Sequence, residues 1–321
     1  MMTSSHNNTL HPDQNDQRLY NNINNNISSS NLNSNRPIDP TFSFNSPALK
    51  IATNNVCGIS LITKQEQLLT LIDDLKLDIL GVSETKLKTK QTHSLLKSSN
   101  EYQSWWNCDD TSPHSSGVGL IMHSSIAKYV QLVRGYKGRV IYANLYLRGR
   151  FKLRIIQVYV HANRADKIAR LDCDKYIIQT IQQAHIQQFK VVIMGDFNAD
   201  PDILNELIAE GKKFHWKYKL LAQLQQLNLI DTYRIFHNAE GSTWSDKYRS
   251  SRIDQIWIDP DLQLDVLYST LDCPEVLPTD HHVLITYFVV DNILGQTPVA
   301  QAKRQKHERV SYHYKSTTVN E

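Results

Sequence analysis

The sequence has few cysteines, no long apolar run and no strong excess of either charge. Its four cysteines lie far apart and form no CxxC pair, which argues against the common zinc and redox motifs. A reduced, intracellular setting is the simplest fit for this cysteine usage. The net charge of +3 permits a polyanionic partner but does not demand one.

Membrane insertion and secretion are also disfavoured. The longest apolar run, residues 283–290, is roughly half as long as a membrane-spanning helix. The N-terminus lacks a basic start followed by an apolar stretch, so it does not resemble a secretory signal. Only Arg18 and Arg36 are basic before Lys50, and this disfavours a mitochondrial presequence. We therefore predict an intracellular protein that is not secreted and does not bind membranes.

The composition divides the chain into three parts. Twelve of the first fifty residues are asparagine, and this segment has too few apolar residues to form a core. We predict a disordered Asn/Ser-rich tail over residues 1–47, a folded domain over 48–291, and a polar, basic, disordered tail over 292–321.

The folded part alternates predicted strands and helices. Apolar runs and alternating patterns predict strands over residues 49–53, 78–82, 117–123, 139–147, 151–160, 189–194, 253–258 and 283–290. Helical periodicity indicates helices over residues 64–76 and 166–188 and one or two more within 202–227. This mixture predicts an α+β or α/β sandwich.

The most informative motif is Gly195-Asp196-Phe197-Asn198, directly after a buried strand. Residues two apart at a strand end point the same way, so a carboxylate and an amide share one rim. Such a pair suits a hard divalent cation or the polarisation of a water. Taken alone, the same residues are equally typical of a tight turn.

Other polar residues also lie just beyond predicted strands. Because strand ends on one rim of a sheet converge, these scattered residues are expected to form one site. They are Asn55, Glu84, Tyr159, Asp196, Asn198, Asp254, Asp280 and His281.

Read in order, these motifs resemble the endonuclease/exonuclease/phosphatase superfamily, over about residues 49–290. That superfamily includes AP endonucleases, endonucleases of non-LTR retrotransposons, deoxyribonuclease I, inositol polyphosphate phosphatases and neutral sphingomyelinases. The resemblance implies a four-layer α/β sandwich of two packed sheets flanked by helices.

The resemblance also implies a metal set and a catalytic set. Glu84 matches the metal ligand, Asn55 lies near metal and phosphate, and Asp280 matches a second-metal or orienting carboxylate. The implied cofactor is Mg²⁺, with Mn²⁺ as a substitute. The implied catalytic residues are Tyr159, Asp196, Asn198, Asp254 and His281.

Their implied roles differ. Tyr159 donates a hydrogen bond to a phosphate oxygen, although a buried strand tyrosine is a frequent alternative. Asp196 activates water or transfers a proton to the leaving group, and Asn198 orients the phosphate or the water. Asp254 orients His281, the catalytic histidine.

Substrate contacts are expected from Arg164, Lys86 and Trp244. Arginine can clamp a phosphate through two hydrogen bonds. The lysine would face phosphate or simply be solvated, and the tryptophan would stack on a base or pack beneath a strand. A basic hairpin is a second candidate: its residues would line a DNA groove or form a solvated face. They are Arg134, Lys137, Arg139, Arg148, Arg150 and Arg154.

Two positions depart from the family pattern. Cys57 stands where Asn or Asp is common, and His161-Ala162 replaces the usual Pro-Asn of AP endonucleases. Both weaken an AP-repair function more than a general nuclease function.

The sequence thus predicts a Mg²⁺-dependent phosphodiesterase that hydrolyses nucleic acid, specifically a DNA endonuclease of retrotransposon type. The alternatives are an AP-site repair endonuclease, a hydrolase of inositol phosphates or sphingolipids, and a non-catalytic binding module. The expected partner is double-stranded DNA, with no obligate protein partner. We expect a monomer, in the nucleus rather than the cytoplasm.

Overall fold

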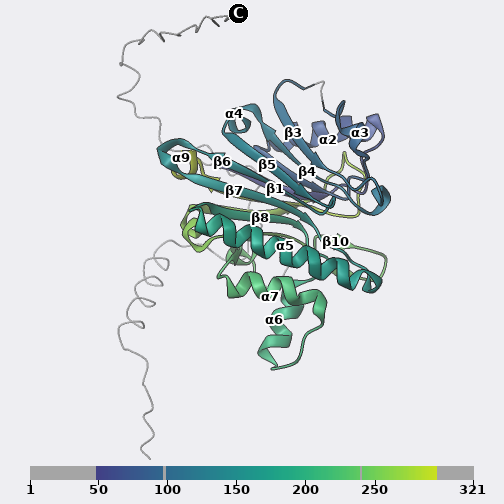
Figure 1. Ribbon diagram of the computed structural model, residues 1–321, viewed down its shortest axis with the longest axis vertical. Helices are drawn as coiled ribbons and strands as arrows, with labels where there is room; N and C mark the ends of the chain where they lie inside the picture. Colours follow the sequence, from purple (N-terminus) through teal and green to yellow (C-terminus); the bar gives the residue numbers. More distant parts are fainter. Residues whose placement is uncertain (1–47, 97–98, 239–240, 295–321) are drawn as a thin grey trace, which may run out of the picture. The chain divides into compact units, whose positions relative to one another are not determined.

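Two six-stranded mixed sheets form the centre of the protein (Figure 1). The computed structural model describes residues 48–96, 99–238 and 241–294. The first sheet has the order β13-β14-β1-β2-β4-β3. Its strands are β1 (Ala48–Asn55), β2 (Ile79–Ser83), β3 (Tyr102–Asn107), β4 (Val118–His123), β13 (Val266–Asp272) and β14 (Val283–Val289).

The second sheet has the order β5-β6-β7-β8-β12-β9, and a separate short hairpin pairs β10 with β11. The strands of the second sheet are β5 (Val130–Tyr136), β6 (Val140–Tyr146), β7 (Lys152–Tyr159), β8 (Lys190–Asp196), β9 (Ile230–Asp231) and β12 (Asp254–Ile258). The hairpin consists of β10 (Trp244–Ser245) and β11 (Ser250–Ser251).

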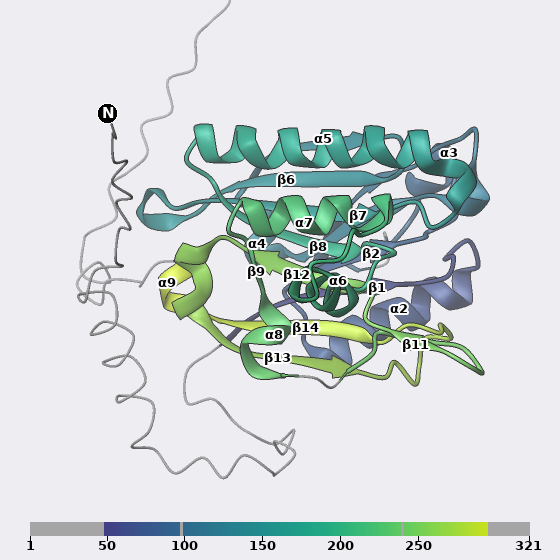
Figure 2. The same ribbon diagram turned by 90° about the horizontal axis from the view of Figure 1, so that it is seen from below.

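Helices cover the outer faces of both sheets (Figures 1 and 2). α2 (Ile62–Leu75) packs on the first sheet, and α5 (Lys167–Ile186) and α7 (Lys219–Gln226) pack on the second. The shorter helices are α3 (Thr89–Thr92), α4 (Ser124–Ala127), α6 (Pro201–Ala209), α8 (Thr232–Phe236) and α9 (Val290–Leu294). The order helix, sheet, sheet, helix confirms the predicted four-layer sandwich.

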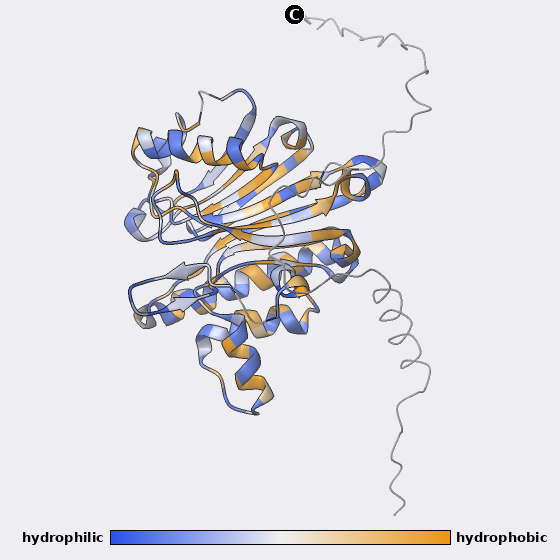
Figure 3. Ribbon diagram, turned by 180° about the vertical axis from the view of Figure 1, so that it is seen from behind, coloured by the Kyte–Doolittle hydropathy of each residue, from blue (hydrophilic) through white to orange (hydrophobic). Residues whose placement is uncertain are grey.

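Apolar side chains fill each of the three interfaces between these layers. Many residues of the strands and helices are accordingly coloured orange, for hydrophobic, in Figure 3. The alternation along β8 shows why. Val192 and Met194 point into the core between the sheets, whereas Val191 and Ile193 pack against the helices. A strand buried on both faces reads as a continuous apolar run, and this is what the sequence shows before Asp196.

The strand directions create one shared rim. β1 is parallel to β2, and β7 is parallel to β8. The C-terminal ends of the two strands in each pair therefore lie at the same edge of their sheet. β14 runs antiparallel to β1, and β12 runs antiparallel to β8, so both begin near those ends. The polar residues that follow or precede these strands are therefore brought to the same edge.

A close approach between the sheets needs glycine at position 81. A Cβ atom there would lie 1.9 Å from Oε1 of Gln157 on the facing sheet. That amide oxygen also accepts a hydrogen bond from the Thr53 hydroxyl at 3.2 Å. A buried polar contact thus ties β1 to β7 just below the rim.

All the predicted strands and helices are present, with bounds that shift by a few residues. β3, β5 and β13 were not predicted as strands. Most residues of these three are partly or fully exposed, so they lack a strong apolar pattern. α9 extends to Leu294, past the predicted domain limit at 291. Residues 1–47 and 295–321, which hold most of both predicted tails, lie outside the described residues. No helix among the described residues is long and apolar enough to cross a membrane.

Candidate active site

Seven of the predicted site residues lie at the shared rim, on both sheets. Asn55, Glu84, Asp280 and His281 come from the ends of β1 and β2 and the segment before β14, all in the first sheet. The second sheet contributes Tyr159, Asp196 and Asp254 from the ends of β7, β8 and β12. The site therefore spans the interface between the two sheets.

Asn55 connects the two sheets directly. Its Nδ2 donates to Glu84 Oε2 and to Asp196 Oδ2, both at 3.0 Å. Its Oδ1 accepts the backbone N–H of Cys57 at 3.0 Å. A flipped amide would set its oxygen against two carboxylates, so this orientation is the favourable one. Asn55 thus acts as a donor that holds two carboxylates together across the sheet interface, and its place in the metal set stays a prediction.

Glu84 has a left-handed backbone, with φ of +56°. Such a conformation is uncommon for residues other than glycine, and it often occurs at functional sites. Lys86 Nζ lies 2.8 Å from Glu84 Oε1, and the nearby Tyr159 hydroxyl also helps to lower the pKa of this carboxyl group. Burial opposes ionisation, but hydrogen bonds from Lys86 and Asn55 lower the pKa of Glu84 below its ordinary value. The group is therefore an anion at neutral pH.

Asp196 is buried, and both of its oxygens accept hydrogen bonds. Oδ2 faces Asn55, and Oδ1 accepts the Asn198 backbone N–H at 2.8 Å. Burial and the neighbouring Asp254 carboxylate raise the pKa of Asp196 to about 7. Near neutral pH such a carboxyl group can both accept and release a proton. Asn198 itself donates from Nδ2 to the Val160 carbonyl at 2.7 Å.

Asp254 and His281 form a buried pair across the sheet interface. His281 Nδ1 lies 2.7 Å from Asp254 Oδ2, and the side chains are 6% and 0% exposed. Burial lowers the pKa of His281, but the Asp254 carboxylate outweighs it and raises that pKa to about 9. The imidazole is thus positively charged at neutral pH, with Asp254 fixing its orientation.

Asp280 completes the rim on the other side of His281. Its Oδ1 lies 3.9 Å from His281 Nε2 and accepts a hydrogen bond from the Cys57 thiol at 3.0 Å. Trp244 Nε1 donates to its other oxygen at 2.8 Å. Burial raises the pKa of Cys57 to about 11, so the thiol is neutral and acts as a donor. The departure at Cys57 therefore removes a carboxylate but keeps a contact to the site.

The predicted substrate-binding residues have different outcomes. Lys86 and Trp244 lie at the rim, where they contact Glu84 and Asp280. Arg164 lies in a short 3₁₀ segment, Arg164–Asp166, after β7, and its side chain is outside the described part.

The basic hairpin is not a single surface. Arg154 is 2% exposed and donates to Asn144 Oδ1, the Thr180 carbonyl and Gln187 Oε1, so its predicted role in a DNA groove is wrong. Arg148 and Arg150 precede β7, and about 25 Å of strand separates them from Tyr159 at its other end. They lie at the opposite rim from the site.

A different group of basic residues adjoins the site. Four lysines line a pocket of about 520 Å³ between the segments that follow β1 and β2. They are Lys64, Lys86, Lys88 and Lys90. Cys57 and His114 also line it, and no carboxylate does. This lysine pocket therefore offers a positive surface that reaches the rim through Cys57 and Lys86.

The donor set fits a hard divalent cation on the Glu84 side of the site. Asp196, Asp254 and His281 also place ligand atoms within 4.8 Å of one another. However, the Asp254 carboxylate raises the pKa of His281, so an ion bound there would have to displace a proton from the imidazole. Glu84 is an anion, and the cation that contacts it is the partly exposed side chain of Lys86. The carboxylate oxygens of Glu84 suit such an ion, and the ligand role of Asp280 stays a prediction.

Two residues that the sequence analysis did not single out hold the backbone of segments next to the rim in place. Arg170 on α5 is fully buried and donates to the carbonyls of His161, Phe197 and Lys217 at 2.6–3.0 Å. The Thr279 hydroxyl donates to the Asn55 carbonyl at 2.7 Å. An arginine within a helix carries no sequence signal for such a role. Asp200, predicted as a helix cap, caps α6 as expected.

Solved structures with the same fold include several enzymes that act on nucleic acid. A Neisseria 3′ phosphatase, NExo, bound to a product DNA hairpin, has a TM-score of 0.60 and 22% identity, over 75% of this chain and 99% of that one. The AP endonuclease LMAP from Leishmania major has a TM-score of 0.61 and 16% identity, over 75% and 88%. The endonuclease domain of TRAS1, a telomere-specific non-LTR retrotransposon, has a TM-score of 0.52 and 12% identity, over 78% and 100%.

At these identities the structural likeness establishes the fold. No curated protein matches the sequence. The family model described as Endonuclease/Exonuclease/phosphatase family matches residues 52–281, which include the rim residues from Asn55 to His281. This confirms the prediction of an enzyme that hydrolyses phosphodiesters. The chain belongs to the endonuclease/exonuclease/phosphatase family.

Proposed function

We propose that the protein is a Mg²⁺-dependent phosphodiesterase that cuts DNA internally, as an endonuclease of retrotransposon type. The observation that carries this proposal is the group of contacts across the two sheets. Asn55 bonds both Glu84 and Asp196, and His281 bonds Asp254. One rim thus holds the anionic Glu84, which can bind a cation, and the charged imidazole of His281. Between them lies Asp196, whose pKa is close to neutral pH.

Each of these groups has a role in phosphodiester hydrolysis. A divalent cation on Glu84 and Asp280 would neutralise charge on the phosphate. Asp196 accepts the proton of an attacking water, positioned with the help of Asn198. His281 and Tyr159 donate hydrogen bonds to phosphate oxygens as negative charge builds on them. Asp254 keeps His281 charged and correctly turned.

Two surfaces beside the rim favour a nucleic acid over a small phosphate ester. The lysine pocket offers four cations for a phosphate backbone. The β10–β11 hairpin carries an exposed Tyr248, 83% exposed, between Lys247 and Arg249. This hairpin also pairs through Trp244 with His281. The short spacing between Trp244 and Ser251 is the feature that favours the retrotransposon type. A chromosomal DNA substrate would place the enzyme in the nucleus, and we expect it to act there as a monomer.

A substrate panel tests this proposal. Supercoiled plasmid, abasic duplex, a duplex with a 3′-phosphate, single-stranded RNA, inositol phosphates and sphingomyelin are each incubated with Mg²⁺, Mn²⁺ or EDTA. We expect plasmid nicking with either metal and none with EDTA. Faster turnover of the abasic duplex would favour repair, and faster turnover of a phosphorylated sugar or lipid would overturn the nuclease proposal.

We expect Glu84→Gln to weaken activation by Mg²⁺. The change keeps the side-chain size but removes the charge that holds the cation, so the half-saturating Mg²⁺ concentration should rise on the order of tenfold or more. The measurement is the nicking rate across a Mg²⁺ titration. Glu206→Gln, at an exposed position on α6, is the matched control. An activation curve shared by both variants would remove Glu84 from the metal site.

The lysine pocket should determine the salt dependence of DNA binding. Replacing Lys88 and Lys90 by glutamine removes two cations that would neutralise phosphates, without touching Glu84. The slope of log affinity against log salt should fall by about 0.9 for each phosphate that is no longer neutralised. Arg148→Gln with Arg150→Gln, at the opposite rim, is the control and should keep the wild-type slope. Binding of an uncut duplex in EDTA across a salt series measures both slopes, and equal slopes would exclude the pocket.

A further inference from the structure

A ridge of three exposed residues, Ser60, Leu61 and Ile62, separates the lysine pocket from a second hollow of about 440 Å³. Leu61 lines the lysine pocket, Ile62 lines the second hollow, and Ser60 and Gln91 line both. The ridge lies between the end of β1, at the rim that holds the active site, and the first turn of α2. None of the roles proposed above uses its two apolar side chains.

The apolar pair of the ridge breaks two local rules. Leu61 is 68% exposed and Ile62 is 72% exposed. Leu61 is also the N-cap of α2, where its side chain offers no acceptor to the first N–H groups of the helix. Serine, threonine, aspartate and asparagine are preferred at that position, and leucine is among the least favoured residues. Neighbouring departures of this kind are expected where function, rather than stability, determines the residue.

The ridge is held firmly in place although it projects. The Gly58 N–H donates to the Glu84 carbonyl at 2.8 Å. Gln65 Nε2 donates to the Ile59 carbonyl at 3.0 Å, and the Ile59 side chain is buried. The apolar pair is therefore fixed in position next to the segment that carries Glu84.

The surroundings of the ridge are positive. The lysine pocket places four lysines on one side of it. The first turn of α2 contains no acidic residue, so the positive end of the helix dipole is not compensated there. Exposed apolar side chains among cations suit a polyanion that also has apolar surfaces, and duplex DNA has both.

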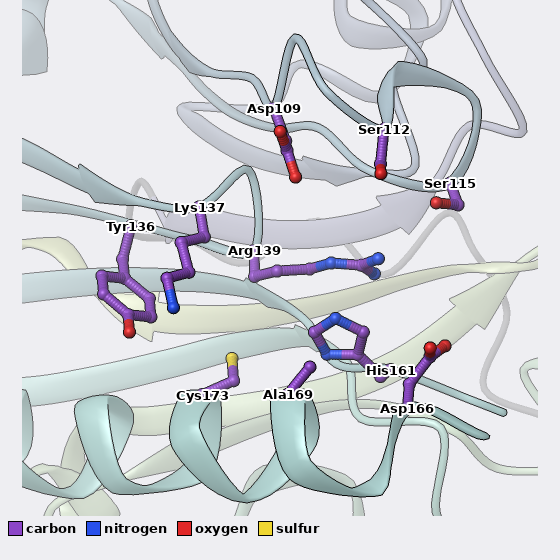
Figure 4. A pocket seen from close by; sticks show the side chains of 10 residues that line it. All are labelled: Asp109, Ser112, Ser115, Tyr136, Lys137, Arg139, His161, Asp166, Ala169 and Cys173. Carbon is purple, nitrogen blue, oxygen red and sulfur yellow. The ribbon is translucent and has the colours of Figure 1, made fainter. Parts of the chain in front are cut away.

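The lysine pocket is distinct from a cavity of about 290 Å³ beside α5 (Figure 4). Pro113 and His114 line the lysine pocket, whereas Ser112 and Ser115, on the same loop, line the cavity. The ridge borders the lysine pocket and not this cavity, so a ligand that fills the pocket meets the apolar pair.

We propose that Leu61 and Ile62 form a wedge that enters the minor groove of duplex DNA and partly unstacks one base step near the cut. The inference rests on the proposed action on DNA. Leucine and isoleucine are among the side chains that wedge between base steps from the minor groove, and neighbouring lysines can hold the phosphates. Six residues separate Leu61 from Asn55, and a chain of that length spans at most about 20 Å. At about 3.4 Å for each step, the unstacked step should lie within about six base pairs of the cut.

An anionic lipid surface also accepts apolar side chains beside lysines. The structure favours DNA over lipid because the apolar stripe of α2 faces inward. Its residues Leu68, Leu71 and Ile72 are buried against the first sheet. Two side chains at one end of a helix are a small anchor for a membrane, but they match the opening of a single base step.

A wedge gives sequence preference without hydrogen bonds to the bases. Pyrimidine–purine steps such as TA are the most easily unstacked. With TA at the wedge position, we expect kcat/KM to be on the order of tenfold higher than with GC at that position.

The test maps the distortion one base at a time. A short duplex carries 2-aminopurine at successive positions along its length, and its fluorescence is measured with the protein in EDTA, where the DNA stays uncut. Wild type should raise the fluorescence on the order of twofold or more at one step within about six base pairs of the cut that is mapped in Mg²⁺. Leu61→Ser with Ile62→Ser should abolish both this rise and the preference for TA. A mismatch at the same step, which costs less to unstack, should restore most of the lost rate.

The thermal midpoint separates a wedge from a structural role. Serine is a good N-cap, so Leu61→Ser alone should raise the midpoint while it reduces the fluorescence rise. Leu264→Ser is the matched control, because Leu264 is 94% exposed and precedes β13, whose start lies at the opposite edge from the site. This control should keep the wild-type fluorescence and preference. A double variant at Leu61 and Ile62 that keeps the wild-type fluorescence pattern would overturn the proposal.

Binding and cleavage together separate this inference from the proposed function. Unstacking without cleavage of any duplex would keep the wedge and reject the endonuclease. Cleavage with no fluorescence change at any position would reject the wedge and keep the endonuclease. Tighter binding to phosphatidylserine vesicles than to the duplex, lost in the double variant, would assign the ridge to lipid and reject the wedge.

Discussion

Asp254→Asn and His281→Asn should each lower kcat on the order of 10²-fold or more, and the double variant should lose little beyond either single one. The 2.7 Å contact between the two buried side chains is the reason. Asp254 keeps His281 charged and turned toward the substrate, so removing either residue removes the same hydrogen bond to the phosphate. The measurement is single-turnover cleavage of a short duplex at saturating Mg²⁺.

Asp280→Asn provides a matched comparison, because it changes an exposed carboxylate next to the same histidine. We expect it to act mainly on the Mg²⁺ requirement. If the losses from Asp254→Asn and His281→Asn multiply in the double variant, the two residues contribute independently and the proposed unit does not exist.

Arg170→Met should give the largest loss of folding stability, about 3–5 kcal/mol. The change leaves three carbonyl oxygens without their donor and leaves Asp174, 3.9 Å from Arg170, as a buried carboxylate without its ion-pair partner. Urea denaturation at pH 8 measures the loss. Arg249→Met, at a side chain that is 76% exposed, is the control and should cost less than about 1 kcal/mol.

The pH dependence identifies the cause of that loss. Burial raises the pKa of Asp174 to about 6, although Arg170 lowers it. A carboxyl group whose pKa is higher in the folded state binds protons more tightly when folded, so protonation favours folding. Without Arg170 the pKa of Asp174 rises further, so the deficit of Arg170→Met should be largest well above pH 6 and shrink as the pH falls toward 6, where both proteins protonate this group. A deficit that stays constant between pH 8 and pH 5 would assign the loss to the carbonyls alone.

The sequence predicted the rim because its residues each stand beside a buried strand. Asp196 and Glu84 follow apolar runs, so their place at a strand end could be inferred without knowing the pairing. The direction of the Asn55 amide could not be inferred. It depends on Asp196, which is 141 positions away and on the other sheet.

The positions of the basic side chains were harder to predict, because they too depend on contacts between distant parts of the chain. Arg139, Arg148 and Arg154 look alike in sequence, yet one enters a cavity, one lies at the far rim and one is buried against α5. Their positions depend on how the helices pack on the second sheet. The lysine pocket combines Lys64 with residues that follow β2, and only the parallel pairing of β1 with β2 brings them together.

The bonds from Asn55 to Asp196, from His281 to Asp254 and from Thr53 to Gln157 all cross from one sheet to the other. The distance between the acid and base groups is therefore a mechanical property of the whole sandwich. A sliding of one sheet over the other would stretch all three bonds at once, even with every rim residue intact. The turnover rate should therefore be sensitive to any sliding of one sheet relative to the other. Substitutions that loosen the apolar layer far below the rim should slow catalysis before they unfold the protein.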